Sequence, residues 1–583
     1  MQFCIGITDS SFCFYEKALC GSQEKQMKEE AAMETSRKKT WSGKRAALTG
    51  ALSLAAAWAM TVPAFAIDQD IVILHTNDIH CGIRDGIGYS GLAAYEKQME
   101  AQTPYVTLVD AGDAIQGAPM GTLSEGEYII QIMNQAGYDF AIPGNHEFDY
   151  GMEQFLSLYG QLDCGYYSCN FVNEPSGTTV FKPYKIISYD DIQVAYVGVT
   201  TPESFTKSTP AYFQDSQGRY VYGFCEDPTG EVLYDQVQKS VDEARAEGAD
   251  YVVLVAHLGK EGITERWSSR SVIANTTGID VLIDGHSHQT YAETMTNENG
   301  EEIPVAQTGT KFANIGKITI TPAGEIHTEL VSSVLDEEGN PAADADMDAL
   351  IAGIESQYAE SLKTVLGHTS VTLTDSDPET GARAVRSSET NLGDFCADAY
   401  RYMMGAEIGM MNGGGIRSTI EAGDITYEDA LTVYPFGNMI CMANVPGFAL
   451  RDALEMGARM YPQETGSFIQ VSGITYTIDS SIPSSVQVDE QGNFAGVSGA
   501  RRVTDIMVNG EPLDDNRMYT VASHNYWLKS GGDGMSMFAG CEILKDDTMV
   551  DVDTITSYIA EYLNGTVGEE YADPAGQGRI TIR

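Results

Sequence analysis

The sequence predicts two α/β domains behind an export signal. The chain has 583 residues, a length that favours two to four domains and also fits two large ones. Hydrophobic residues make up 43% of it, which is ordinary for a globular protein and too many for a disordered one. Apolar strand candidates also alternate with helical stretches along the chain. This alternation is typical of buried sheets covered by helices.

The chain is strongly acidic. It has 83 acidic and 35 basic side chains, and its formal net charge is -48. Such a surface repels a phosphate polymer and an anionic membrane, which excludes nucleic acid as a docking partner and adhesion to such a membrane. A small anionic ligand remains compatible with this charge if a local basic pocket holds it.

Residues 1–66 are predicted to be an upstream extension followed by a signal peptide. Basic residues at 37–45 precede an uncharged, Ala- and Leu-rich stretch at 46–62, and Ala64-Phe65-Ala66 ends it with a cleavage pattern. We expect cleavage after Ala66 and a product that is secreted or extracytoplasmic, without a membrane anchor. The alternative is an uncleaved N-terminal anchor, since the stretch is nearly long enough to span a bilayer. Met33 begins an ordinary signal sequence, so we attribute residues 1–32 to an over-extended start.

Seven cysteines follow the predicted cleavage site, an odd number that cannot all pair within one chain. Cys164 and Cys169 are close enough in sequence to pair, although nothing in the sequence requires it. No CxxC pair is present, which argues against a thiolate zinc site. Most of these residues are interpreted as buried thiols.

The first domain is predicted to span residues 67–343. Its strand candidates are 71–74, 105–109, 140–142, 193–199, 251–255, 280–283 and 317–321, and its helical stretches include 92–101, 128–136 and 231–247. Residues 344–366 are predicted to form one interdomain helix, because apolar residues recur there at every fourth position from Leu350 to Leu362. A second α/β domain, 367–583, follows.

Five of the predicted strands end at residues that can bind metals. These blocks hold Asp78, His80, Asp113, Asn145, His146, Asp149, His257, His286 and His288. The carboxyl ends of strands in an α/β sheet lie along one edge, where ligands bind. Five of the nine histidines of the chain fall in these blocks, and this concentration favours a site over structural histidines.

The ligand types are Asp, His and Asn, which suit Zn²⁺, Mn²⁺, Co²⁺ or Mg²⁺. The set is too large for one tetrahedral ion, so the sequence predicts two divalent metal ions. A two-metal site activates water and clamps a phosphoryl group during in-line displacement.

The second domain contributes candidate substrate residues. Two glycine clusters, at 413–415 and 531–534, offer turns whose backbone N–H groups could approach an anion. Arginine offers a fork for phosphate, an aromatic pair can sandwich a base, and an aspartate can accept from ribose hydroxyls. The candidates are Arg386, Asn412, Arg417, Phe436, Trp527 and Asp533.

These motifs resemble the calcineurin-like metallophosphoesterases and, more closely, the 5′-nucleotidase family, which includes UDP-sugar hydrolases and 2′,3′-cyclic-nucleotide phosphodiesterases. The resemblance implies a metallophosphoesterase sandwich followed by an α/β substrate domain. It implies that Asp113 bridges two metals, that Asp78, His80 and His288 complete one site, and that Asn145, His257 and His286 complete the other. His146, oriented by Asp149, would stabilise the transition state. Two positions depart from the family pattern: Cys81 replaces Gly, and His288 replaces the Gln of some bacterial relatives.

The same resemblance implies that Phe436 and Trp527 stack on the base, that Arg386, Asn412 and Arg417 hold the phosphate or ribose, and that Asp533 holds the ribose. The predicted function is a secreted 5′-nucleotidase, a metal-dependent hydrolase of nucleoside 5′-monophosphates. The alternatives are a UDP-sugar diphosphatase or a 2′,3′-cyclic-nucleotide phosphodiesterase/3′-nucleotidase, and a non-catalytic secreted nucleotide-binding protein. A nucleotide must bridge the two domains, so catalysis is expected to need a closed arrangement reached by a hinge near residues 362–368.

Overall fold

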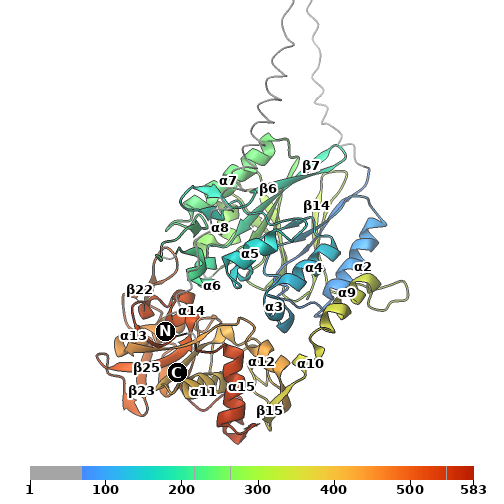
Figure 1. Cartoon of the computed structure of the whole chain (residues 1–583). Helices are drawn as coiled ribbons and strands as arrows, with labels where there is room; N and C mark the ends of the chain where they lie inside the picture. The colour runs from blue at the N-terminus through green and yellow to red at the C-terminus, as the bar shows by residue number, and fades with distance from the viewer. Residues whose placement is uncertain (1–67, 216, 263, 547) are drawn as a thin grey trace, which may run out of the picture. The chain divides into compact units, whose positions relative to one another are not determined.

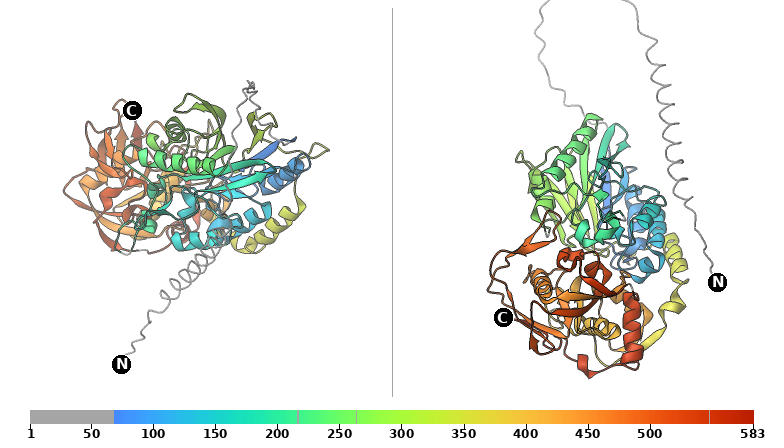
Figure 2. Two further views of the ribbon diagram at one scale, coloured as in Figure 1. Left: turned by 90° about the horizontal axis from the view of Figure 1, so that it is seen from above. Right: turned by 60° about the vertical axis from the view of Figure 1, so that its left-hand side comes forward.

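A computed structural model describes residues 68–215, 217–262, 264–546 and 548–583. The predicted signal peptide and its cleavage site lie outside these residues. Within them, no helix is both long and apolar enough to cross a membrane. The elements before β15 and those from β15 onward gather in two groups, which the colour gradient separates in Figures 1 and 2.

The N-terminal domain is built on two facing sheets. One sheet has the order β14-β13-β1-β2-β3, formed by Ile326–Val331, Ile315–Ile320, Ile71–Thr76, Val106–Asp110 and Phe140–Ala141. The other has the order β11-β12-β10-β9-β7-β6, formed by Thr290–Thr296, Glu302–Thr308, Val281–Ile283, Tyr251–His257, Ile192–Thr200 and Tyr184–Tyr189. Buried side chains of both sheets form one cluster between them, which includes Ile73, Val109, Val194 and Val255. The predicted sandwich is therefore confirmed.

Helices cover the outer face of each sheet. Against the first sheet pack α2 (Gly88–Glu100), α4 (Glu127–Ala136), α5 (Met152–Tyr159) and α9 (Ala345–Glu355). Against the second pack α7 (Glu231–Ala246) and α8 (Ser269–Ala274). The limits of α4 follow from its sequence, because Gly126 and Gly137 at its two ends adopt left-handed backbone angles that glycine accepts without strain.

The C-terminal domain surrounds a five-stranded sheet. Its order is β19-β16-β25-β18-β26, formed by Ile469–Ser472, Ile408–Asn412, Met518–His524, Ile440–Pro446 and Glu542–Lys545. One face packs on α11 (Asn391–Met404), α12 (Tyr427–Val433) and α15 (Asp551–Ser557), and the other on α13 (Gly447–Gly457). Smaller sheets flank it: β17-β15-β27 (Gly423–Thr426, Val365–Thr369, Thr566–Val567), β24-β23-β20-β28 (Glu511–Pro512, Val503–Val508, Ile474–Ile478, Ile580–Ile582) and the hairpin β21-β22 (Val486–Val488, Phe494–Val497).

The prediction of a single helix over residues 344–366 is wrong. Asp344 caps α9 by accepting a hydrogen bond from the Met347 N–H at 2.9 Å, but α9 ends at Glu355. The side chains of Ser356 and Gln357 donate to the carbonyl of Gly353, so they compete for a group that a longer helix would use. A short helix α10, Ala359–Leu362, follows, and β15 then pairs with β17.

The seven cysteines after the predicted cleavage site are all described, and each is a buried or half-buried thiol outside any disulfide. The pairing of Cys164 with Cys169 that the sequence left open is not formed. The interpretation of these residues as packing thiols agrees with the structure.

Candidate active site

The strand ends of the N-terminal domain bring the predicted metal ligands together. Five of the seven adopt left-handed backbone angles, with φ between 48° and 75°: Asp78, His80, Asp113, His286 and His288. Such angles are uncommon outside glycine and cost of order 1–3 kcal/mol each, so they persist where surrounding structure enforces them. The loops after β1, β2 and β10 therefore turn sharply to aim these side chains at one point.

Four of these side chains form a compact cluster. Ligand atoms of Asp78, His80, Asp113 and His288 all lie within 4.8 Å of one another. The Nε2 atoms of His80 and His288 are 3.0 Å apart, and His288 Nε2 is 3.4 Å from an oxygen of Asp78. Burial lowers the pKa of both histidines well below its ordinary value, which keeps the imidazoles neutral and able to donate lone pairs.

Of the remaining three predicted ligands, His257 contacts this cluster directly, through Asp113. His257 Nε2 lies 3.2 Å from an oxygen of Asp113, and the His257 Nδ1 side faces the Ala111 carbonyl at 2.7 Å. Asn145 is buried, and its side-chain oxygen has no hydrogen-bond partner in the described chain. The Nε2 atom of His286 instead contacts Glu203 at 2.9 Å, which leaves Nδ1 of His286 for another ligand.

The residues present fit a divalent metal site. Neutral imidazole nitrogens face one another at hydrogen-bond distance around carboxylates, and a buried amide oxygen lacks a partner among the described residues. A bound cation would accept lone pairs from the facing imidazole nitrogens and from the amide oxygen, because nitrogens and oxygens of these kinds are ordinary metal ligands. When bound, divalent ions at such a site supply Lewis-acid stabilisation of phosphoryl oxygens and an activated water.

A buried glutamate holds the loops of this cluster. The carboxylate of Glu147 accepts hydrogen bonds from the backbone N–H groups of Gly144, Asp113 and Ala114, at 2.6, 2.8 and 2.8 Å. A Cβ atom on Gly144 would lie 2.3 Å from an Asp113 oxygen, so this close approach requires glycine. The Gly-Asn-His-Glu motif thus combines a ligand candidate with the residue that fixes its neighbours.

His146 lies beside the cluster and is paired with Asp149. The His146 Nδ1 and Asp149 Oδ2 atoms are 2.5 Å apart, and the rings of His146 and His80 have centroids 5.2 Å apart. Burial alone would lower the pKa of His146, but Asp149 and Asp113 raise it above its ordinary value. This arrangement favours a protonated imidazole that can donate a hydrogen bond from Nε2.

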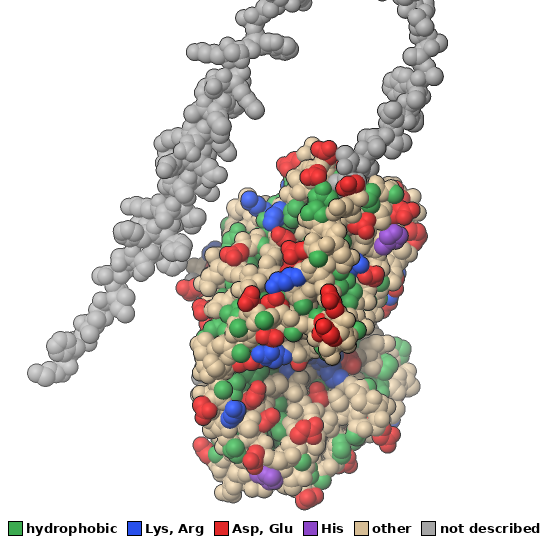
Figure 3. All heavy atoms as spheres, turned by 90° about the vertical axis from the view of Figure 1, so that its right-hand side faces the viewer, with side chains coloured by type: hydrophobic (Ala, Val, Ile, Leu, Met, Phe, Trp, Pro, Cys, Tyr) green, Lys and Arg blue, Asp and Glu red, His purple; other side chains and the backbone are tan. Residues whose placement is uncertain are grey.

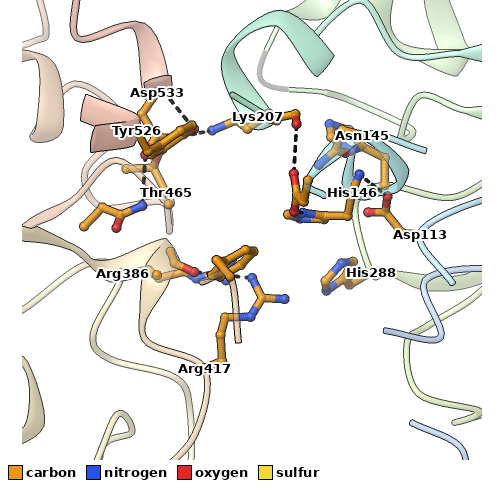
Figure 4. Close-up of a pocket in the computed structure, with 18 of the residues that line it drawn as sticks. Asp113, Asn145, His146, Lys207, His288, Arg386, Arg417, Thr465, Tyr526 and Asp533 are labelled. Atoms are coloured by element: carbon orange, nitrogen blue, oxygen red, sulfur yellow. Dashed lines mark hydrogen bonds and ion pairs between the residues drawn. The ribbon is translucent and has the colours of Figure 1, made fainter. Parts of the chain in front are cut away.

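A cavity of about 660 Å³ joins this cluster to the C-terminal domain. Figure 4 shows Arg386 and Arg417 across it from Asp113, Asn145 and His288, and Figure 3 shows basic side chains in the hollow between the two domains. Neither arginine forms an ion pair with a carboxylate within the described residues, and the Arg386 Nε atom is buried without a partner there. Burial, and then Arg417, lower the pKa of Arg386 well below its usual value. Two half-buried guanidinium groups that lack a carboxylate partner among the described residues favour an anionic ligand in the cavity.

The structure corrects the predicted role of Trp527. Its side chain is fully buried in the core of the C-terminal domain, and its Nε1 atom donates to Asp533 at 3.2 Å. The neighbouring Tyr526 lines the cavity instead, together with Phe436. Tyr526 and Trp527 both lie on the four-residue helix α14 (Asn525–Leu528), where consecutive side chains point in different directions. An enclosed indole cannot stack on a ligand in this cavity.

Asn412 and Asp533 lie side by side at the cavity wall. Asn412 donates to Asp533 at 3.1 Å, and its oxygen is 2.9 Å from His524 Nε2. Two N–H groups of the first glycine cluster are bonded within the protein. The N–H groups of Gly413 and Gly414 donate to the carbonyls of Phe468 and Gly466, so they are not free for an anion.

Sequence reasoning missed four residues of the site: Glu147, Glu203, Lys207 and Tyr526. Two of them carry a recognisable signal. Glu147 follows His146 directly, and Glu203 stands three residues after β7, a sixth strand end with a ligand-type residue. Lys207 and Tyr526 carry no such signal, because their position at the cavity depends on contacts between distant segments.

Two family models match the chain. The calcineurin-like phosphoesterase model matches residues 71–290, and the model of the 5′-nucleotidase C-terminal domain matches residues 365–540. With the buried Asp and His cluster, the first match defines a calcineurin-like metallophosphoesterase, a metal-dependent phosphoric ester hydrolase. The second match adds a 5′-nucleotidase C-terminal domain, so the chain is similar to the 5′-nucleotidases in both of its domains.

Known relatives extend over most of the chain. The 5′-nucleotidase of Bos taurus is 28% identical over 592 residues, covering 92% of this chain and 94% of that protein. The trifunctional nucleotide phosphoesterase protein YfkN of Bacillus subtilis is 28% identical over 565 residues, but the chain spans only 35% of its length. The crystal structure of a 5′-nucleotidase precursor from Thermus thermophilus covers 88% of this chain with a TM-score of 0.72 and 25% identity, and the match covers 99% of that structure.

Proposed function

We propose that the protein hydrolyses nucleoside 5′-monophosphates to nucleoside and phosphate outside the cytoplasm, with two divalent metal ions. The observation that carries this proposal is the pair of arginines without a carboxylate partner, Arg386 and Arg417, that face the Asp and His cluster across one cavity of the described chain. A phosphate there would meet positive groups from both domains. Relatives named as 5′-nucleotidases support the substrate class.

The side chains divide the work as follows. Asp78, His80, Asp113 and His288 would hold one metal, and Asn145, His257 and His286 with Asp113 would hold the other. His146, held by Asp149, donates a hydrogen bond to the phosphoryl oxygen on which negative charge builds up. Arg386 and Arg417 orient the phosphate, which brings the ester to a fixed angle of attack.

The nucleoside part would lie further along the cavity. Asp533 and Asn412 offer an acceptor and a donor for ribose hydroxyls. Phe436 and Tyr526 supply aromatic faces for the base, with Tyr526 in the place assigned from the sequence to Trp527. We retain 67–343 and 367–583 as the two domains, with the connection at 344–366, and a signal peptide cut after Ala66.

Phosphate release from a substrate panel tests the proposal. Purified protein supplied with Mn²⁺, Zn²⁺, Co²⁺ or Mg²⁺ is expected to hydrolyse AMP with a higher kcat/KM than UDP-glucose, 2′,3′-cyclic AMP or a small aryl phosphate. Chelation should abolish the activity, and added divalent metal should restore it. If UDP-glucose or the cyclic nucleotide has the highest kcat/KM, that compound replaces AMP as the proposed substrate. If no compound releases phosphate, the protein is a non-catalytic nucleotide-binding protein.

Tyr526→Ala should weaken AMP hydrolysis by roughly 10–100-fold in kcat/KM, the value of one base–aromatic stack. The aryl phosphate has no base, so its hydrolysis should change much less. Trp527→Ala should instead lower the free energy of unfolding by about 3–5 kcal/mol, because it empties a buried core site. Steady-state kinetics on both substrates and thermal melting separate the two effects. Tyr526→Phe keeps the ring and removes only the hydroxyl that contacts Thr206, so it is the reference for Tyr526→Ala. Equal further losses on AMP and the aryl phosphate from Tyr526→Phe to Tyr526→Ala would show that the ring does not bind the base.

A further inference from the structure

Residues 203–208, which follow strand β7, support two parts of the catalytic site. Glu203 lies at 2.9 Å from the Nε2 atom of His286, and its other oxygen accepts from the Thr264 N–H at 2.7 Å. The Ser208 hydroxyl donates to Asp149 at 2.9 Å, on the oxygen that does not face His146. The short helix α6, Ser204–Lys207, connects these two residues. A movement of α6 would therefore shift the contacts that hold His286 and the His146–Asp149 pair.

The same segment is bonded to the C-terminal domain. Lys207 Nζ lies 3.0 Å from Asp533 Oδ1, and the Tyr526 hydroxyl donates to the Thr206 carbonyl at 2.5 Å. Figure 4 shows Lys207, Tyr526 and Asp533 meeting at the cavity wall. Only 15% of the Lys207 side chain and 4% of the Asp533 side chain are exposed, so water and salt screen this ion pair weakly.

The Asp533 carboxylate is a fixed partner. Its other oxygen accepts from Trp527 Nε1 and Asn412 Nδ2, both within the C-terminal domain. Opposite charges hold its pKa below the ordinary value despite its burial, with Lys207 as the largest favourable contribution. An ion pair between a fixed carboxylate and a half-buried lysine holds its two partners together more strongly than an exposed pair does.

We propose that Lys207 is a positioning residue that fastens α6 to the C-terminal domain through Asp533, and so couples closure of the two domains to the alignment of His146 and His286. The proposal rests on the proposed function for its kinetic effect, since catalysis is taken to need both domains. The physical contact itself does not depend on the substrate.

Hydrogen–deuterium exchange on the purified full chain without substrate tests the contact. In Lys207→Met, deuterium uptake should rise in peptides that cover residues 203–208 and 525–534, because both sides of the ion pair are released. Lys207→Arg should restore most of the protection. Lys317→Met is the matched control, since Lys317 pairs with Glu329 at 2.9 Å on a sheet edge away from the cavity. Unchanged uptake in Lys207→Met would overturn the proposal, whether or not the protein hydrolyses nucleotides.

Kinetics then separate positioning from direct substrate binding. Lys207→Met is expected to lower kcat by roughly 10–150-fold on both AMP and an aryl phosphate, the range that loss of one charged hydrogen bond gives. Lys207→Arg should recover most of kcat on both. A lysine that binds the substrate phosphate would instead raise KM and leave kcat unchanged, and that result would overturn the positioning role.

Discussion

Asp113→Asn is expected to abolish turnover, by roughly 10³-fold or more, since metal ions contribute several kcal/mol of charge stabilisation to such reactions. Asp113 lies between the two groups of ligand candidates, 3.8 Å from His80 Nε2 and 3.2 Å from His257 Nε2. Removal of its charge therefore weakens both proposed metal sites at once. Phosphate release from AMP, together with metal content per chain, measures the effect.

The matched control for this variant is Asp163→Asn, which changes an exposed aspartate outside the cavity. It should retain activity, metal content and melting temperature. Asp113→Asn should fold like the parent while it loses metal. Normal turnover by Asp113→Asn would exclude Asp113 as a metal-bridging residue.

His146→Ala is expected to lose roughly 10²–10⁴-fold in kcat while it keeps its metals and still binds substrate. The reason is its position: His146 faces the cluster from the side and is held through Nδ1 by Asp149, so it is placed to stabilise charge rather than to bind metal. Asp149→Asn should cause a smaller loss of the same kind, because its effect acts through the orientation of His146. Single-turnover rates and metal analysis distinguish these variants from Asp113→Asn.

His327→Ala is the control, since His327 is an exposed histidine that does not line the cavity. It should behave like the parent. Near-normal turnover by His146→Ala with its metals retained would refute the catalytic role of His146.

The sandwich could be predicted because its strands are buried on both faces. Continuous apolar runs such as 71–74 and 251–255 therefore marked the strands β1 and β9, each of which extends two residues further into the ligand block. The connection at 344–366 could not be predicted in the same way. Apolar residues continue at helical spacing beyond Glu355, although the side chains of Ser356 and Gln357 donate there to the Gly353 carbonyl. Strand β15 forms because it pairs with β17, about sixty residues away in sequence.

The ligand candidates could be listed from the sequence because each follows a strand end, and the sheet brings those ends to one edge. The sequence could not show whether Tyr526 or Trp527 lines the cavity, because this depends on which of the two adjacent rings packs into the C-terminal core. The role of Lys207 could not be predicted from the sequence either, since its partner Asp533 lies 326 residues further along the chain. Contacts across the cavity are set by tertiary packing, which leaves no local pattern.

A metal titration of the metal-free protein tests the central claim most directly. Phosphate release from AMP should be absent without metal and should rise with added divalent ion until about two ions are bound per chain, as a two-metal site requires. Metal content and rate are measured on the same samples. Full activity of the chelated protein, or full activity at one bound ion per chain, would contradict the account.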